Sequence, residues 1–417
     1  MRPRLLLLIP TTSYRTEAFL EAARALGVDI VIASERANAL EEAFPDGLLT
    51  LDFQKPDVAA REVAEFARRY PFDAVVPVDD LTIVVGAAIA GALGLPSNPV
   101  ESARAARNKA VMRQRLRGME VRQPDFTLLS IDDTPDAAAS RVEYPCVVKP
   151  TILAGSRGVI RADDPGQFTA AFRRLEAILR TPEVSALGDE ARQVLVERFV
   201  PGVEVALEGL LVRGELRVLA LFDKPDPLDG PFFEETVYVT PSRLPTGMQD
   251  AIAGCTARAG RALGLQEGPV HAELRVNEAG PWLIEIAARS IGGRCSRALR
   301  FGTGMLLEEL ILRHALGMEI PSLEREPYPA GVMMIPIPGA GVLQEVRGQA
   351  EALVLPGIEE IDITAHMGQE LVPLPEGWRY LGFIFARAET PEAVEAALRA
   401  AHRRLEFVIG ELPAPLR

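Results

Sequence analysis

The stretch 268–294 reads GPVHAELRVNEAGPWLIEIAARSIGGR, two apolar-alternating segments on either side of a turn rich in asparagine and glycine. Each segment has the period of a β-strand, and each carries a glutamate where a strand facing a core would carry valine or isoleucine. These glutamates are Glu273 and Glu285. Because alternate residues of a strand share a face, His271 and Arg275 lie on the face of Glu273. The stretch predicts a hairpin with charged groups on one face.

The length of the hairpin loop decides whether the two glutamates meet. An odd loop, such as 277–281, places Glu273 directly opposite Glu285, whereas an even loop places them on opposite faces. Two carboxylates about 5 Å apart repel each other unless a cation lies between them. Proteins typically hold Mg²⁺ with one or two carboxylates, while substrate phosphates complete the octahedral coordination. Arg289, on the same face, would bind the phosphate oxygens that the metal ion does not contact. A solvated hairpin with outward charges is the equally weighted alternative.

Length and composition bound the class of protein. A chain of 417 residues predicts two or three domains. A hydrophobic content of 48% and a charged content of 25% are typical of a globular protein. The formal net charge of −13 argues against a surface that binds nucleic acid or acidic lipid without specificity. Any phosphate that the protein binds therefore needs a local basic site.

Cysteine usage and hydropathy bear on the compartment. Cys146, Cys255 and Cys295 are far apart and form no CxxC pair, which indicates a reducing compartment. The apolar run 5–10 is too short for the core of a signal peptide. No uninterrupted apolar stretch approaches the roughly 18 residues of a membrane span. We therefore expect a cytoplasmic protein with no membrane partner.

Strand-length apolar runs alternate with helical patterns over residues 1–105 and predict a Rossmann-like domain with a parallel sheet. The residues after the first strand, IPTTSY at 9–14, lack the GxGxxG fingerprint, so dinucleotide binding is not expected. The fourth strand ends in Asp79 and Asp80, and ligands of such sheets gather at the carboxyl ends of strands. Either aspartate would contact a substrate cation or cap the next helix.

A glycine-rich segment, YPCVVKPTILAGSRGV at 144–159, follows a short strand that ends in Lys149. The backbone N–H groups of Gly155, Ser156 and Gly158, beside the lysine, would suit a polyphosphate. The spacing GxxxxGK[ST] of a P-loop is absent, so a plain hairpin is the default alternative.

Two more glutamates flank a Pro-Gly turn in VLVERFVPGVEVALEG, residues 194–209. Glu197 precedes the turn and Glu204 follows it, a spacing that can bring both to one ligand, although charge on an edge strand is a common alternative. The loop 222–235, dense in proline and glycine, contains Lys224. Long loops in compact domains are often functional.

A helix over 100–118 carries Lys109, and a third segment begins near residue 328 with strands and an amphipathic helix. We expect an α/β and α+β multidomain protein. Its divisions would be a Rossmann-like domain at 1–105, a central domain at 106–326 with a lid at about 118–198, and a small α+β domain at 327–417.

Taken in order, these motifs resemble the ATP-grasp superfamily over residues 100–315. The five matching motifs are Lys109, Lys149 with its glycine loop, Glu197 with Pro-Gly-x-Glu204, Glu273 and Glu285-x-x-x-Arg289. The resemblance implies an ATP-grasp fold between a Rossmann-like N-terminal domain and a small C-terminal domain. Each motif is weak alone, but five in register are specific.

The resemblance also implies roles. Lys109 and Lys149 would hold the phosphates of ATP, while Gly155, Ser156 and Gly158 would close over them as a lid. Glu197 and the backbone at Phe199 would meet adenine, and Glu204 the ribose. The metal, one or two Mg²⁺ with Mn²⁺ as an alternative ion, would bind Glu273 and Glu285, and Arg289 would bind the transferred phosphoryl group.

The sequence departs from the common Glu-x-Asn-Pro-Arg pattern. Ala287 and Ala288 replace the asparagine and proline, and alanine offers no oxygen to a second metal ion. The run SIGGR ending in Arg294 resembles instead the branch of L-amino-acid ligases and carnosine synthases. In that branch, His271, Arg294 and the Lys224 loop would recognise an amino acid, since an arginine can bind an α-carboxylate bidentately. A structural role is the alternative for His271.

The implied activity is that of an ATP-dependent carboxylate–amine ligase, which forms an amide through an acyl phosphate, acting on amino acids. Its partners would be small molecules, and a homodimer is compatible with the resemblance. One alternative is a phosphoribosylglycinamide-synthetase-like or carboxylase-type enzyme, disfavoured because no extra basic cluster and no biotin-carboxylase signature is found. The other is an ATP-binding module without turnover, disfavoured because a pure binder needs no complete set of metal carboxylates and cations.

Overall fold

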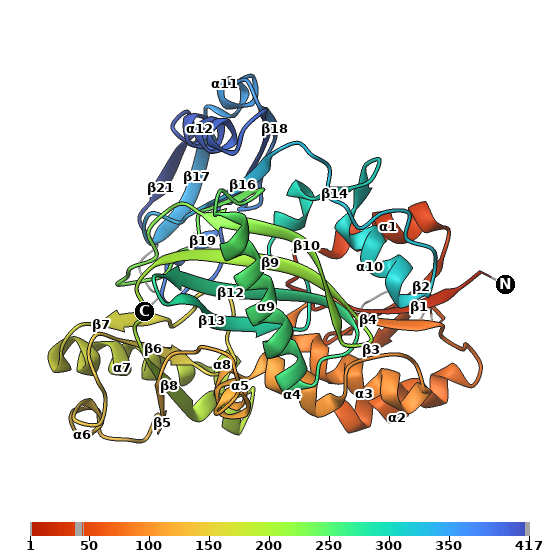
Figure 1. Cartoon of the computed structure of the whole chain (residues 1–417), viewed down its shortest axis with the longest axis horizontal. Coiled ribbons are helices and arrows are strands. Elements are labelled where there is room, and N and C mark those ends of the chain that lie inside the picture. Colours follow the sequence, from red (N-terminus) through yellow and green to blue (C-terminus); the bar gives the residue numbers. More distant parts are fainter. Residues whose placement is uncertain (1, 38–43, 45, 413–417) are drawn as a thin grey trace.

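The computed structural model describes residues 2–37, 44 and 46–412 of the chain. Figure 1 shows four parts of the chain, namely the N-terminal domain, a lid, a central sheet and a C-terminal segment. Residues from all four line one cavity. The sheets are parallel in the N-terminal domain and antiparallel elsewhere. The predicted combination of α/β and α+β parts is confirmed.

The N-terminal domain is a parallel sheet in the order β3-β2-β1-β4. Its strands are β1 (Arg4–Leu8), β2 (Asp29–Ser34), β3 (Leu48–Thr50) and β4 (Ala74–Pro77), and its helices are α1 (Thr16–Leu26), α2 (Pro56–Ala67) and α3 (Ile83–Leu93). Leu5 and Leu7 face the core that contains Phe19 of α1, whereas Leu6 and Leu8 face the core of α2 and α3. Helices thus cover both faces, which explains the continuous apolar run of β1.

Residues 100–116 form two helices, α4 (Val100–Arg107) and α5 (Lys109–Leu116). The predicted single helix over 100–118 is therefore wrong. Asn108 has extended backbone angles, and its side chain accepts hydrogen bonds from the backbone N–H groups of Ala110 and Val111. An asparagine is a preferred N-cap because its carbonyl satisfies such free donors. The break makes Lys109 the first residue of α5.

The lid is an antiparallel sheet in the order β5-β8-β6-β7, covered by α7. Its elements are β5 (Phe126–Ser130), α6 (Pro135–Ala139), β6 (Cys146–Pro150), β7 (Ile160–Ala162), α7 (Pro165–Leu179), α8 (Pro182–Ser185), the 3₁₀ turn Asp189–Arg192 and β8 (Gln193–Arg198). Phe168, Phe172 and Leu175 of α7 are fully buried against the sheet. The lid thus has its own apolar core.

The central sheet has eight strands in the order β13-β12-β9-β10-β11-β16-β20-β18. Its strands are β9 (Val203–Val212), β10 (Glu215–Lys224), β11 (Val237–Thr240), β12 (Gly268–Asn277), β13 (Gly280–Ala287), β16 (Ala330–Ile335), β18 (Ile358–Ile363) and β20 (Gly382–Arg387). Helix α9 (Thr246–Leu263) crosses one face of it (Figure 1) and packs with α4 and α5 on β9, β12 and β13. The opposite face of these strands borders the cavity.

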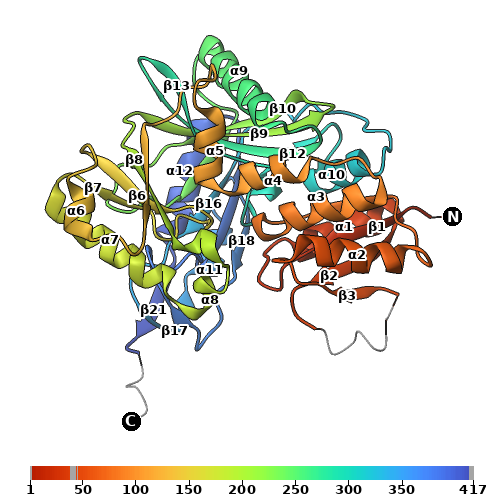
Figure 2. The same ribbon diagram turned by 90° about the horizontal axis from the view of Figure 1, so that it is seen from below.

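The C-terminal segment belongs in part to the central sheet. Strands β16, β18 and β20 extend that sheet, while β17 (Gly341–Arg347), β19 (Glu370–Leu371) and β21 (Glu406–Gly410) form a small sheet of their own. Helices α11 (Gln349–Leu353) and α12 (Pro391–His402) complete the segment. Figure 2 shows its strands β17 and β21 next to the lid. The predicted boundary at 326–327 falls in a loop, but the sheet continues across it.

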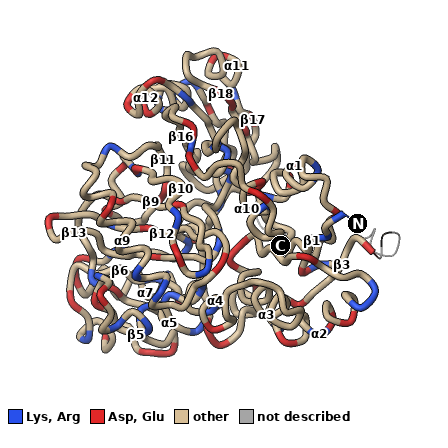
Figure 3. Tube along the Cα trace, turned by 45° about the vertical axis from the view of Figure 1, so that its right-hand side comes forward, with Lys and Arg blue, Asp and Glu red and all other residues tan. Residues whose placement is uncertain are grey.

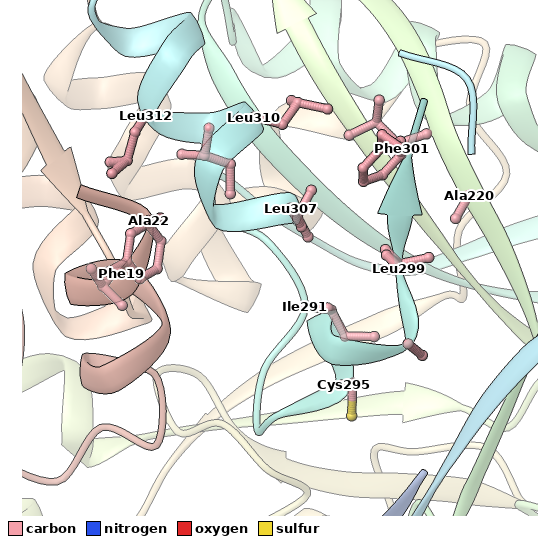
Figure 4. Close-up of a cluster of buried hydrophobic side chains, with 14 of the residues drawn as sticks. Phe19, Ala22, Ala220, Ile291, Cys295, Leu299, Phe301, Leu307, Leu310 and Leu312 are labelled. Carbon is pink, nitrogen blue, oxygen red and sulfur yellow. The ribbon is translucent and has the colours of Figure 1, made fainter. Parts of the chain in front are cut away.

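Apolar packing joins the N-terminal domain to the central region (Figure 4). Phe19 and Ala22 of α1 lie in one cluster with Leu307, Leu310 and further residues of α10 (Leu307–Ala315). The 3₁₀ turn Cys295–Ala298 and the short strands β14 (Arg300–Phe301) and β15 (Met305–Leu306) connect β13 to α10. The cluster is continuous between the two parts, so burial of apolar surface stabilises their association.

Charged residues are interleaved along the described trace (Figure 3). Positive and negative positions are scattered over all parts of the described trace, although the sequence carries a net charge of −13. In the described part of the chain, no helix combines the length and the hydropathy that a transmembrane span requires.

Candidate active site

The hairpin β12–β13 presents its charged face to the cavity. Val270, Ala272 and Leu274 point to the core under α9, whereas His271 and Glu273 line the cavity. This alternation follows the period of two that the sequence predicts.

Glu273 is paired directly with Glu285, which is the arrangement that the sequence analysis associated with an odd loop. Asn277 pairs with Gly280, so the loop contains only Glu278 and Ala279 and is even rather than odd. A β-bulge between Leu283 and Glu285 restores the shared face, because one extra residue shifts the register by one. An even loop without a bulge would have placed the two glutamates on opposite faces, and the extra residue Ile284 brings them back to one face.

Lys109 is the cation nearest to Glu285. Its Nζ lies 3.1 Å from Glu285 Oε1 and donates a hydrogen bond of 2.8 Å to the carbonyl oxygen of Leu153, in the glycine loop. The side chain of Glu285 keeps 22% of its surface exposed and that of Glu273 keeps 19%. The two carboxylates therefore remain accessible from the cavity.

A second acidic group surrounds Lys224. Its Nζ lies 2.8 Å from Glu204, 2.5 Å from Glu235 and 3.2 Å from Glu273. Burial alone would lower the pKa of Lys224, but the three carboxylates outweigh it and raise that pKa well above its usual value. Burial and the neighbouring Glu273 raise the pKa of Glu235.

These three glutamates are close enough together to hold a metal ion. The ammonium group of Lys224 contacts all three carboxylates, and Arg275 and His271 contact Glu204 and Glu273, so cations of the protein already offset much of the charge of this group. Glu285, in contrast, has one lysine and an exposed edge. The chemistry of the donors therefore favours a metal ion on the side where Glu273 faces Glu285, with phosphate oxygens completing its ligands.

Glu197 is the centre of a buried ion cluster. Arg113 Nε lies 2.7 Å from one carboxylate oxygen and Lys149 Nζ lies 2.6 Å from the other. Burial opposes the charged carboxylate, but Arg113 and Lys149 outweigh it and lower the pKa of Glu197. Burial also lowers the pKa of Lys149. Sequence reasoning missed Arg113, although its position one helical turn after Lys109 places both on one face of α5.

Three residues of the glycine loop have left-handed backbone angles. Gly155 has φ +64°, Ser156 +55° and Gly158 +74°. A Cβ at Gly158 would lie 2.7 Å from Leu175 Cδ1, so a side chain there has no room. Gly155 and Ser156 line the cavity.

Arg289 is held by the N-terminal domain. Its Nε donates a hydrogen bond of 2.9 Å to Asp80, and its Nη1 donates one of 3.0 Å to the carbonyl oxygen of Ser290. Burial raises the pKa of Asp80, but the guanidinium group outweighs this and lowers it. Asp79 stands before the 3₁₀ turn Asp80–Thr82, where its backbone N–H donates a hydrogen bond of 3.2 Å to the Thr82 hydroxyl.

The remaining predicted positions are also engaged. His271 contacts Glu208 through Nδ1, and its Nε2 lies 3.4 Å from Glu273. Burial lowers the pKa of His271, but Glu208 and Glu273 raise it to about 9. The backbone N–H of Phe199 donates to the carbonyl oxygen of Pro145, and Arg275 Nε donates a hydrogen bond of 3.1 Å to Glu204.

One cavity of about 580 Å³ connects these groups. The predicted residues that line it are Asp79, Asp80, Lys109, Lys149, Gly155, Ser156, Glu197, Phe199, Glu204, His271, Glu273, Glu285 and Arg289. Gly158, Lys224 and Arg294 are not among its lining residues. Arg294 instead pairs with Asp362 and lies 3.8 Å from Glu17.

Three family models match separate parts of the chain. They describe an ATP-grasp N-terminal domain over residues 20–97, an ATP-grasp domain over 142–298 and an L-amino acid ligase C-terminal domain 2 over 333–410. The chain is a member of the ATP-grasp superfamily. The predicted ATP-grasp fold is confirmed, and the central match contains the Lys149, Glu273 and Glu285 positions.

Similar proteins include enzymes whose names are ligase or synthase. The structure of L-amino acid ligase from Bacillus licheniformis has a TM-score of 0.82 and 26% identity, covering 98% of this chain and 99% of that one. Alanine–anticapsin ligase of Bacillus subtilis (strain 168) is 26% identical over 66% of this chain and 62% of that protein. Carnosine synthase 1 of Gallus gallus is 30% identical over 76% of this chain and 36% of that protein. The chain thus spans less than two thirds of the length of both curated relatives.

Proposed function

We propose that this ATP-grasp protein is an ATP-dependent carboxylate–amine ligase that acts on amino acids and forms ADP. The observation that carries the proposal is the pairing of Glu273 with Glu285 beside Lys109 and Arg289 in one cavity. An acidic pair next to two cations suits a metal-bound polyphosphate, in which each negative oxygen meets a positive partner. The names of the relatives support the same reaction class.

Glu273 and Glu285 would hold Mg²⁺, with Mn²⁺ as an alternative ion. The metal would offset charge on the phosphoryl group during its transfer to a carboxylate. His271 contacts both Glu208 and Glu273 and so orients the Glu273 carboxylate. Lys224 holds that carboxylate from the other side, 3.2 Å away.

ATP would lie between the lid and the central sheet. Lys109 and Lys149 would meet its phosphates, and Gly155, Ser156 and Gly158 would form the covering loop. Lys109 already spans the distance between Glu285 and the carbonyl oxygen of Leu153, so it can connect the metal side with the glycine loop.

The base and sugar of ATP would lie beyond the phosphate-binding lysines. We retain Glu197 and Phe199 for adenine and Glu204 for ribose as predictions. Glu197 is bound to Arg113 and Lys149, so it would act by orienting the lysine rather than by offering a free carboxylate.

The activated carboxylate would lie near Arg289, whose guanidinium group is aimed by Asp80. In this reaction the carboxylate oxygen takes the terminal phosphoryl group of ATP and ADP leaves. The amine then attacks the acyl carbon, so that phosphate leaves and the amine gives up a proton. Arg289 would neutralise the phosphoryl oxygens in both steps.

One substrate would carry an apolar side chain. Tyr14, Met334, Trp378 and Tyr380 line the cavity together with the charged groups. Aromatic and thioether walls bind apolar side chains by burial and contact. For amino-acid recognition we retain His271, which lines the cavity, and the Lys224 loop, whereas Arg294 pairs with Asp362 outside the lining, so that its predicted contact with a substrate carboxylate is left to the test given in the Discussion.

The test is release of ADP and phosphate from MgATP with the twenty amino acids, singly and in pairs, with product masses read by mass spectrometry. We expect release that requires one pair and a product mass equal to the two amino acids minus water. Binding of ATP without release for any pair would reject amino-acid ligation and favour another carboxylate or an ATP-binding module. The homodimer and the cytoplasmic location stay predictions, and light scattering of the purified chain tests the former.

A further inference from the structure

The loop between β19 and β20, residues 372–381, reaches from the C-terminal segment to the glycine loop of the lid. The backbone N–H of Gly158 donates a hydrogen bond of 2.9 Å to the carbonyl oxygen of Pro375. The neighbouring Arg157 donates from Nε to the carbonyl oxygen of Glu376 at 3.0 Å. A Cβ on Gly155 would lie 3.4 Å from Trp378, so the two loops are in close contact.

Arg174 of α7 adds a side-chain contact to the same loop. Its Nε and Nη2 donate two hydrogen bonds to Glu376, of 2.5 and 2.8 Å, in a bidentate arrangement. The guanidinium carbon of Arg174 also lies 4.9 Å from the centre of the Phe232 ring. The lid is thus fastened at its glycine loop and at its helix, by one short segment from outside the lid.

The same segment forms a wall of the cavity. Trp378 and Tyr380 line it, and Tyr380 packs near Phe383, which in turn packs against Tyr14 of the N-terminal domain. A side chain bound against Trp378 would therefore touch the segment that fastens the glycine loop.

We propose that residues 373–380 are a latch that holds the glycine loop closed over the nucleotide, with Glu376 as its positioning residue. The proposal rests on the proposed function for the identity of the nucleotide. Through Trp378, the latch also connects lid closure to the compartment for the second substrate. Glu376 is not among the residues that line the cavity, and it acts through Arg174, which its carboxylate binds, and through Arg157, which donates to its backbone carbonyl oxygen.

The size of the effect follows from exposure. The side chains of Arg174 and Glu376 are 44% and 42% exposed, and ion pairs at such sites contribute modestly to a conformational equilibrium. Bidentate geometry places this pair near the upper end of that range. A change of about fivefold in nucleotide affinity is therefore expected, and not a loss of binding.

The experiment uses the full chain with Glu376→Lys, which reverses the charge opposite Arg174. We expect the Kd for MgADP, measured by calorimetry, to rise about fivefold. Trypsin should cleave faster after Arg157, because the glycine loop is released. The double variant Arg174→Glu with Glu376→Lys restores an ion pair of opposite polarity and should recover most of both losses.

Glu176→Lys is the matched control. Glu176 lies on the same helix and pairs with Arg180 at 2.9 Å, away from the latch, so the same charge change should alter neither Kd nor cleavage. Equal effects of Glu376→Lys and Glu176→Lys, or no effect of Glu376→Lys, would overturn the latch.

Failure of the latch and failure of the proposed ligase function can be distinguished by different measurements. If the amino-acid ligase assay succeeds, Glu376→Lys should raise the KM for ATP about fivefold while kcat stays within about twofold. If the ligase assay fails, nucleotide affinity and cleavage after Arg157 still test the latch, because neither requires turnover.

Discussion

Glu285 and Glu197 line the same cavity, yet their surroundings are opposite. Glu285 has one lysine at 3.1 Å and a side chain 22% exposed, whereas Glu197 has two cations within 2.7 Å and a side chain 4% exposed. A carboxylate with free acceptor positions can bind a metal ion or another ligand. A carboxylate whose oxygens are both used in ion pairs with the protein instead stabilises the arrangement of those partners. The difference separates a site that awaits a ligand from a charge cluster that organises the site.

The largest expected effect is a loss of stability when the ion cluster around Glu197 is broken. Glu197→Gln leaves Arg113 and Lys149 buried without their counter-charge, and breaking a buried ion group in this way costs about 3–5 kcal/mol of unfolding free energy. Urea unfolding measures the loss, and Glu176→Gln on the exposed face of α7 is the control. A loss below about 1 kcal/mol, as for a surface pair, would contradict the comparison.

Acid adds a second readout of the same cluster. The pKa of Glu197 is lowered in the folded protein, so its contribution to stability is fully present above its unfolded-state pKa of about 4.3. The contribution declines as the pH falls through the lower, folded-state pKa. The difference in unfolding free energy between wild type and Glu197→Gln should therefore shrink from pH 7 towards pH 2. A difference that stays constant over this range would show that its charge is not what stabilises the fold.

The second largest effect is expected on the rate of ADP formation when Glu285, the partly exposed carboxylate, is removed. Glu285→Ala should reduce ADP formation by about 10²-fold or more, because the metal and the phosphoryl group lose a charged ligand. Stability should change little, since the side chain faces the cavity and not a core. Circular dichroism and urea unfolding check the fold. Normal ADP release by a folded variant would remove the central claim about this hairpin.

A smaller effect on kcat is expected at Asp80, which positions Arg289 through a hydrogen bond. Asp80→Asn keeps the shape of the side chain but removes the charge that holds Arg289, at a cost of about tenfold in kcat. The KM for ATP should change less than kcat, because Asp80 acts on the arginine and not on the nucleotide. A change confined to KM would instead favour the sequence-based prediction that Asp80 contacts a substrate cation.

The smallest effect is expected at Arg294. This residue pairs with Asp362 outside the cavity lining, so Arg294→Lys should change the KM of either amino acid by less than about threefold. A larger rise in one KM would support the prediction that Arg294 binds a substrate carboxylate. Arg297→Lys is a suitable control, because Arg297 pairs with Glu360, which lies on β18 like Asp362, the partner of Arg294.

The sequence predicted the parts of the site that follow from local periodicity. The alternation in 268–287 predicted that His271 and Glu273 share a face, and five weak motifs in order predicted the ATP-grasp fold. The pairing of Glu273 with Glu285 could not be derived securely, because it depends on a bulge at Ile284 that no local pattern announces.

Partners from distant segments were also beyond the sequence. Asp80 and Arg289 are separated by 209 positions, and Glu376 and Arg174 by 202. Arg113 was within reach, since it follows Lys109 by one helical turn, but its burial depends on tertiary packing. The prediction of one helix over 100–118 failed because Asn108 caps a second helix within it.

The continuation of the central sheet into the C-terminal segment has a consequence for dissecting the protein. Strand β11 pairs with β16, so a fragment ending at 326 would expose the backbone donors and acceptors of β11 along an open edge. Such edges recruit other chains and aggregate. The N-terminal three quarters of the chain is therefore not a self-sufficient unit, and a shorter catalytic fragment would have to provide a substitute strand.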